Sequence, residues 1–328
     1  MLLTIRISSW EEARRLVSYF SGEIFRGQER SDWGLSPSLE RVANQFSHPK
    51  NTIPFSELKV VDEFRRRAHF YLDYTPPEHS LIDWLSLIQH HGGPTRLLDF
   101  SYSFFVASFF AVSQAVSDAA VWVIDKHALA LNAHQIAYPE KYRGIESLDK
   151  FIDTVQYDNA TMKKIFEESF LSDKPPQAVI PLDPLFLTPR LSIQQGVFLV
   201  PCAVTCDFQE CLSSTLGSNA NDFFKQDTIV LDSKGNSTDK ILDLYANSKI
   251  MKIIIPKECH KAAIEDLWSM NINAATLFPG LDGFAKSLVY HFRGYEIDEE
   301  YSKRIFKRLA AILQAGKKLD LYTELEQQ

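Results

Sequence analysis

The chain turns between two apolar segments at Gln89-His90-His91-Gly92-Gly93-Pro94-Thr95-Arg96-Leu97-Leu98-Asp99-Phe100-Ser101. The glycines and the proline must end any helix that precedes them, because proline lacks the N–H that a helix interior needs. Most connections between helices are small and polar, whereas this one also carries two imidazoles, a cation and a carboxylate. We therefore expect the segment to lie at the centre of a functional site.

Helical periodicity dominates both sides of this segment. Leu81 to His90 forms an apolar run that predicts one helix, and Tyr102 to Val116 predicts another that is apolar almost all round and hence buried. Earlier, Glu57 to Leu72 repeats apolar side chains at steps of three and four residues. The first third of the chain is therefore predicted to be mainly helical.

Short apolar runs predict strands later in the chain. They occupy 120–124, 178–181, 197–200 and 252–255, and one earlier strand is predicted over 23–26. We expect an α+β fold with one mixed, mainly antiparallel sheet and helical additions at both ends. No internal repeat interrupts the chain, so a single domain over 1–328 is predicted, with a helical N-terminal part over about 1–116, a mixed sheet part over about 117–290 and C-terminal helices over about 291–328.

Composition argues against several classes of protein. The net charge of −7 and the pI of about 5.7 argue against a broad nucleic-acid surface, which needs surplus lysine and arginine. The four cysteines lack the paired spacing of a zinc ribbon and are expected to be unpaired thiols. No apolar run is long enough to cross a bilayer, so we expect no membrane contact and a location in the bacterial cytoplasm.

A second marked segment, Ile24-Phe25-Arg26-Gly27-Gln28, ends the strand predicted over 23–26. A guanidinium there, followed by a glycine that lets backbone approach a ligand, suits bidentate capture of a phosphate or carboxylate. Arg26 could equally pair with an internal acid such as Asp99, and the sequence leaves both interpretations open. Gln28 could donate and accept hydrogen bonds beside it.

The central segment offers further polar groups. Thr95 can cap the residues that follow, and Arg96 and Asp99 are three residues apart, so they would be neighbours in a helix and could form an ordinary salt bridge. His91 lies at a helix end, which favours the imidazolium and brings its titration toward neutral pH. No set of two histidines and a carboxylate has recognisable ligand spacing, so no metal is expected.

A third polar group precedes the strand predicted over 197–200. Gln194 and Gln195 are adjacent there, and two amides rarely both serve a core because burial would leave their donors and acceptors unpaired. One of the two is expected to face a cleft. If it meets Arg26 and the central segment, the site holds cations, amides and imidazoles but few carboxylates.

These segments resemble the FRG domain, a bacterial family named after its Phe-Arg-Gly motif. The resemblance rests on residues 24–28 and 89–101, and later on Arg190 to Phe198 and Ala275 to Gly283, so it covers most of the chain. It implies a compact intracellular protein and says little about activity.

The order of the segments is also similar to that of the mono-ADP-ribosyltransferases. In that superfamily an aromatic-Arg-Gly strand end contacts the dinucleotide, a strand bearing Ser or Thr precedes a helix rich in Ala and Phe, and a Glu-x-Glu motif precedes a final strand. Phe25-Arg26-Gly27, Thr95 to Ser101 and Gln194-Gln195-Gly196 occupy the corresponding places. The chain departs from the pattern at the catalytic glutamate, which falls on Gly196 or, with a shift of one residue, on Gln195.

The resemblance implies an enzyme that uses NAD, without a metal, to attach ADP-ribose to a macromolecule. The acceptor would be a protein or RNA, and the enzyme would serve as a bacterial toxin or phage-defence effector, with an inhibitory protein as a further partner. The residues implied in NAD binding are Arg26, Gly27, Gln28, Thr95 and Arg96, and those implied in catalysis are His91, Gln195 and Asp99. The missing glutamate favours the alternative of a non-catalytic nucleotide- or protein-binding module. A third alternative is a metal-independent nuclease or hydrolase with His91 and Asp99 as acid and base.

Overall fold

The computed structural model describes residues 2–142, 158–184, 188–217, 228–230, 238–292 and 299–325. These residues build one sheet of eight strands in the order β5-β6-β3-β2-β4-β8-β1-β7. Five neighbouring pairs are antiparallel and two are parallel, which confirms the predicted α+β fold with a mixed, mainly antiparallel sheet. The strands are β1 Leu3–Arg6, β2 Glu23–Gln28, β3 Leu98–Ser101, β4 Ala119–Asp125, β5 Val179–Leu182, β6 Gly196–Pro201, β7 Thr228–Val230 and β8 Ile250–Ile255.

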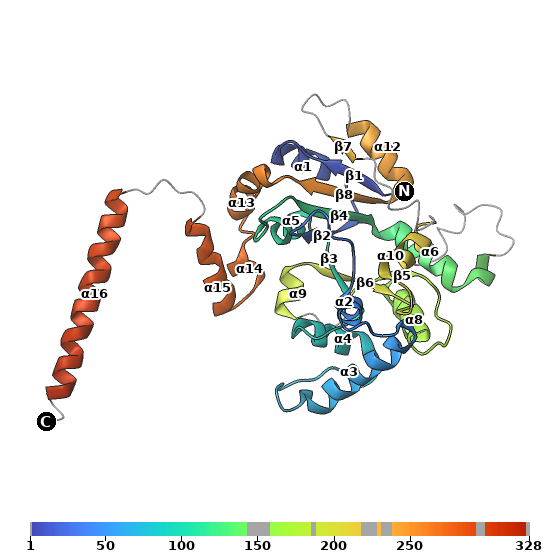
Figure 1. The fold of residues 1–328 in the computed structure, drawn as a ribbon, viewed down its shortest axis with the longest axis horizontal. Helices are drawn as coiled ribbons and strands as arrows, with labels where there is room; N and C mark the ends of the chain where they lie inside the picture. Colours follow the sequence, from blue (N-terminus) through green and yellow to red (C-terminus); the bar gives the residue numbers. More distant parts are fainter. Residues whose placement is uncertain are drawn as a thin grey trace.

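Helices cover both faces of the sheet (Figure 1). The α-helices are α1 Trp10–Val17, α2 Ser38–Gln45, α3 Ile53–Ala68, α4 Leu81–His90, α5 Phe104–Val112, α6 Lys126–Ala137, α8 Asn159–Phe170, α9 Pro189–Ile193, α10 Phe208–Thr215, α12 Thr238–Ser248, α13 His260–Ser269, α14 Ala274–Leu277, α15 Leu281–Ser287 and α16 Glu299–Leu325. Short 3₁₀ helices occupy η1 Lys50–Thr52, η2 Pro139–Tyr142, η3 Lys257–Cys259 and η4 Leu288–Phe292.

The centre of the sheet is buried on both faces because its strands are almost wholly apolar. On β4, Val121 and Val123 pack with α1, α5, α12 and α13 on one face, whereas Trp122 and Ile124 pack with α6 and α10 on the other. All four side chains are at most 1% exposed. A strand that reads as a continuous apolar run is therefore the central strand here, as expected when helices cover both faces.

The expected helical part over 1–116 contains three strands. β1, β2 and β3 all lie in it and belong to the same sheet as the later strands. β1 joins the sheet by parallel pairing with β8 and β7, which are more than 200 residues away in sequence. Such pairing leaves no local signal, and β1 spans four residues, so periodicity does not reveal it.

The long helix α16 lies at one side of the molecule in Figure 1, away from the sheet. Its Phe306, Leu309 and Leu313 are more than half exposed. In the range over about 291–328 where C-terminal helices were expected, the described residues after η4 form one helix, α16. Among the described residues, no helix is both long and apolar enough to cross a membrane.

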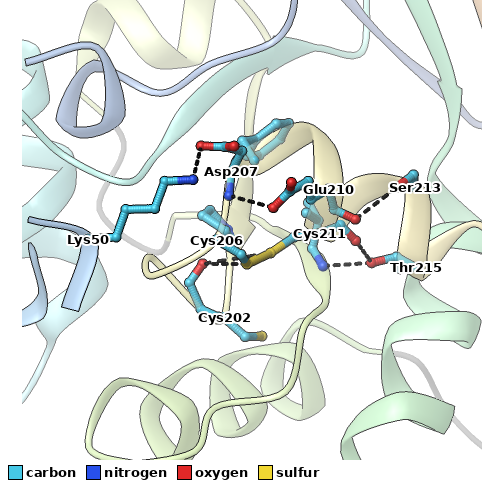
Figure 2. Close-up of a disulfide and its surroundings, with 12 residues drawn as sticks. Lys50, Cys202, Cys206, Asp207, Glu210, Cys211, Ser213 and Thr215 are labelled. Atoms are coloured by element: carbon cyan, nitrogen blue, oxygen red, sulfur yellow. Dashed lines mark hydrogen bonds and ion pairs between the residues drawn. A yellow bond between two sulfur atoms is a disulfide. The ribbon is translucent and has the colours of Figure 1, made fainter. Parts of the chain in front are cut away.

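Two of the cysteines are joined, in contrast to the expectation of unpaired thiols. Cys206 and Cys211 form a disulfide at the start of α10, where Asp207 and Glu210 also build a capping box (Figure 2). The pair is five residues apart, and the helix start brings its Cα atoms to 6.8 Å. Comparison with zinc-ribbon spacing could not reveal a pair formed by local helix geometry. Cys202 and Cys259 are buried free thiols.

Candidate active site in the split of the sheet

The sheet opens between β2 and β3. These neighbouring strands pair at a single position, Phe25 with Ser101, although β2 pairs along all six of its residues with β4 and β3 along all four of its residues with β6. Beyond that one pair lies a cavity of about 860 Å³, which both strands line. Its volume falls within the usual range of small-molecule sites, about 300–1,000 Å³.

The predicted segments meet in this cavity, although not always through the predicted side chain. Of the eight residues expected to bind NAD or take part in catalysis, Arg26, Gly27, Gln28 and Asp99 line it. Thr95, Arg96, His91 and Gln195 are not among its lining residues. The lining is completed by Phe25, Glu29, Trp33, Gly34, Ser36, Arg41, Ser86, Gln89, His90, Phe100, Ser101, Val106, Ala107, Phe110, Thr188, Arg190, Leu191, Gln194, Gly196 and Phe198.

Arg26 crosses the split. Its Nη1 donates to the backbone carbonyl of Asp99 at 2.7 Å, and its buried Nε has no hydrogen-bond partner among the described residues. Burial lowers the pKa of Arg26, the Asp99 carboxylate opposes this shift, and Arg41 adds to it. The guanidinium therefore keeps hydrogen-bonding capacity that the protein itself does not use.

Gly27 serves the packing of the sheet as well as the cavity. A Cβ atom at this position would lie 1.8 Å from the carbonyl oxygen of Ala107 and 2.6 Å from the backbone nitrogen of Ala111. The glycine therefore allows α5 to press directly against β2. Close approach of backbone was expected here, but the approaching group is a helix of the same chain.

Asp99 is exposed on β3 and is held by a short chain of hydrogen bonds. Gln89 donates from Nε2 to Oδ1 of Asp99 at 2.7 Å, and its Oε1 accepts a hydrogen bond from Oγ1 of Thr95. Thr95 is completely buried, and its backbone N–H donates to Oγ of Ser38 at 3.0 Å. Thr95 was expected to help bind NAD, but its burial keeps it from contacting a ligand. It instead fixes the orientation of the Gln89 amide that holds Asp99.

Arg96 is part of the protein core, contrary to its expected role in NAD binding. It is 2% exposed, its Nε donates to both carboxylate oxygens of Glu57 at 3.0 and 2.9 Å, and its Nη2 also pairs with Glu57. Its Nη1 donates to the carbonyl oxygens of Pro201 and Cys202 at 3.3 and 3.1 Å. The segment after Arg96 is a strand, so Arg96 and Asp99 are not the helical neighbours that their spacing suggested.

Gln28 lines the cavity with its amide already engaged. Its Oε1 accepts from Nε1 of Trp122 at 2.6 Å, and its Nε2 donates to the carbonyl oxygen of Gly34 at 2.9 Å. Gly34 and the adjacent Trp33 both line the cavity. Gln28 therefore positions this wall and is not available as a free donor and acceptor for NAD.

At two places the cavity is lined by the residue before the predicted one. His90 replaces His91 at the end of α4, and Gln194 replaces Gln195 before β6. Gln195 has a positive φ of 51° and lines a separate cavity of about 600 Å³. On a helix, consecutive side chains point about 100° apart, so the sequence can locate a segment at a site without identifying which of its side chains faces inward.

Two arginines of the cavity had not been assigned a role. Arg41 on α2 and Arg190 on α9 join Arg26 in the lining, and within the described residues none of the three forms an ion pair with a carboxylate. Arg190 lies over the ring of Phe278 at 4.6 Å from its centroid. No local pattern marks Arg41, because its position depends on how α2 packs beside the sheet.

The described part of the chain holds no group of three His, Cys, Asp or Glu residues that could bind a metal ion. The carboxylates in the lining are Glu29 and Asp99, which lie among three arginines. Such an excess of cations in a concave site suits an anionic ligand.

Comparison with known families identifies part of the cavity lining as belonging to a recognised domain. Residues 21–120 match the FRG domain, and the match runs from before β2 into β4, so it includes both strands of the split. No curated protein and no solved structure matches the chain. The resemblance to the mono-ADP-ribosyltransferases stays a prediction.

Proposed function

We propose that this protein, whose residues 21–120 carry an FRG domain, binds NAD between β2 and β3 and transfers its ADP-ribose group to a macromolecule. The observation that carries the proposal is the cavity in the split of the sheet, where Arg26 has an unused Nε and Asp99 presents an exposed carboxylate. The Arg26 guanidinium suits an anion, and the Asp99 carboxylate suits a developing positive charge.

Charge and shape support binding of a dinucleotide. Arg26 and Arg41 carry guanidinium groups that match the oxygens of a pyrophosphate. Trp33 and Phe110 supply aromatic surface in the same cavity, on which a base or a nicotinamide ring can stack. The cavity volume of about 860 Å³ leaves room for both halves of NAD.

Transfer of ADP-ribose would proceed by breaking the bond between the ribose C1′ and the nicotinamide nitrogen. The bonding electron pair leaves with nicotinamide, positive charge develops on the ribose, and a lone pair of the acceptor then forms the new bond to C1′ while its proton passes to water. Asp99 would stabilise the positive charge, and Gln89 would keep the carboxylate oriented without any rearrangement during the reaction. The carboxylate that the residues before β6 lack would thus come from β3.

The alternative of a non-catalytic binding module is favoured by one observation. At the start of β6 the cavity is lined by Gln194 and Gly196, with no carboxylate at the position of the catalytic glutamate of the mono-ADP-ribosyltransferases. In that case NAD or another nucleotide would bind through the same arginines without turnover.

The proposed acceptor, a protein or RNA, and the proposed roles as a toxin or defence effector with an inhibitory partner apply to the enzyme.

Nicotinamide release from radiolabelled NAD tests the proposal. Asp99→Asn should lower the rate constant on the order of 100-fold with little loss of NAD affinity, because its carboxylate meets full charge only as the bond breaks. Arg26→Gln should instead weaken binding. The matched control is Arg66→Gln, which removes an exposed arginine of α3 whose partner is Glu63.

The outcomes separate the two functions. NAD binding that depends on Arg26, without release of nicotinamide or labelling of a lysate, would establish the binding module. Activity that Asp99→Asn leaves unchanged would refute the catalytic role of Asp99.

A further inference from the structure

The basic side chains of the cavity can be grouped into two pairs by their electrostatic influence on one another. Arg26 on β2 and Arg41 on α2 form the first, and His90 at the end of α4 and Arg190 on α9 form the second. The four side chains come from four separate elements that meet around one cavity. Its three arginines repel one another, so their collection at a concave surface favours an anion between them.

The members of each pair lie close enough to influence one another. Arg41 contributes to the lowered pKa of Arg26, and Arg190 contributes to the lowered pKa of His90 after solvent exclusion and His91. The described residues offer no compensating ion pair to any of the arginines. Among the described residues, the side chain of Arg41 donates to the carbonyl oxygen of Ser36, and that of Arg190 lies over the ring of Phe278.

The two carboxylates of the cavity do not balance these charges. Asp99 accepts from the amide of Gln89 at Oδ1, and Glu29 forms no ion pair within the described ranges. Three arginines against two carboxylates leave the lining with excess positive charge even when His90 is neutral. Because Arg26 and Arg41 reach the cavity from β2 and α2 and Arg190 reaches it from α9, a ligand with two separate anionic groups could engage the arginines of both pairs.

NAD brings its negative charge to one place, the pyrophosphate. We propose that the preferred ligand of this cavity is a dinucleotide with a further phosphate on its adenosine ribose, as in NADP, with the pyrophosphate at Arg26 and Arg41 and the further phosphate at Arg190 and His90. The proposal rests on the dinucleotide binding put forward above and specifies which dinucleotide is used. Arginine binds a phosphate monoester through two parallel hydrogen bonds, and a histidine beside it adds a third donor.

Calorimetric titration of the full chain with NAD and with NADP tests the preference. We expect NADP to bind at least tenfold more tightly, since charged hydrogen bonds to one phosphate are worth about that factor or more. Arg190→Gln and His90→Gln should each reduce this ratio several-fold and leave the affinity for NAD within about twofold. Arg26→Gln should weaken both ligands by the same factor, and Arg66→Gln should change neither.

Each result bears on a different claim. If NAD binds as tightly as NADP, the second phosphate site is refuted while dinucleotide binding stands. If Arg190→Gln and His90→Gln are both folded, as judged by circular dichroism, and both keep the wild-type ratio of NADP to NAD affinity, the position of the site is refuted. If neither dinucleotide binds the folded wild-type protein, both this inference and the proposed function fail.

Discussion

Replacing Arg96 by methionine should destabilise the fold strongly, although Arg96 lies within the segment that marks the site. The side chains of Arg96 and Glu57 are 3% and 0% exposed, so the substitution would leave a buried carboxylate without its cation. Removing one partner of a buried ion pair typically costs about 3–5 kcal/mol. Two carbonyl oxygens, of Pro201 and Cys202, would also lose their donor.

A double-mutant cycle separates the stranded charge from the lost packing. In Glu57→Met/Arg96→Met the carboxylate is gone as well, so most of the loss should be recovered, leaving about 1–2 kcal/mol for the carbonyl groups. Arg66→Met is the matched control, because its ion pair with Glu63 is exposed and such pairs contribute about 0–1 kcal/mol.

Urea unfolding, followed by tryptophan fluorescence, measures these differences through the midpoint and slope of the transition. The single variant should lose at least 3 kcal/mol of unfolding free energy at pH 7, and the double variant should be the more stable of the two. A loss below about 1 kcal/mol in Arg96→Met, equal to that in the control, would refute the assignment of Arg96 to the core.

Three further predictions follow from neighbouring contacts. Gly27→Ala should lower the free energy of unfolding in urea by about 1–3 kcal/mol, because its methyl group would meet the carbonyl oxygen of Ala107; an unchanged free energy would contradict the packing of α5 on β2. Burial lowers the pKa of Lys252 to about 8 in the folded protein, against about 10.5 for an ordinary lysine. Between pH 8 and 10.5 the unfolded chain therefore binds more protons at this residue than the folded protein does. Stability should rise with pH across that window and be flatter in Lys252→Met, and equal slopes would rule this out. Thr95→Val should lower kcat with KM nearly unchanged, since it frees Gln89; a change in KM alone would instead indicate a ligand contact.

The sequence was informative about the fold where its signals are local. The apolar run over 120–124 predicted β4, and the glycines and proline after His90 correctly ended α4. The strand predicted over 23–26 is present as β2, but it continues to Gln28, so Arg26 lies within the strand and not at its end. The single register position between β2 and β3 could not be predicted, because it depends on how α5 and the neighbouring strands pack. The cavity depends on that one feature of the sheet.

The sequence located the segments that line the cavity better than it identified the side chains that face it. Arg26 and Asp99 both line the cavity, whereas at two other places the lining residues are His90 and Gln194 instead of their predicted neighbours. A rotation of about 100° per helical residue decides which neighbour faces inward, and only the packed helix fixes that rotation. Arg41 carries no local signal at all.

The adjacent residues Thr95 and Arg96 show why polarity within a marked segment does not by itself indicate a ligand contact. Both are buried, and each acts on another side chain: Thr95 on Gln89, and Arg96 on Glu57. A loss of activity in a variant of either residue would therefore arise from a misplaced Asp99 or from an unstable fold. Only side chains with unused capacity in the cavity, such as Arg26 and Arg190, can report ligand binding directly, because their substitution leaves the protein's own hydrogen bonds almost unchanged.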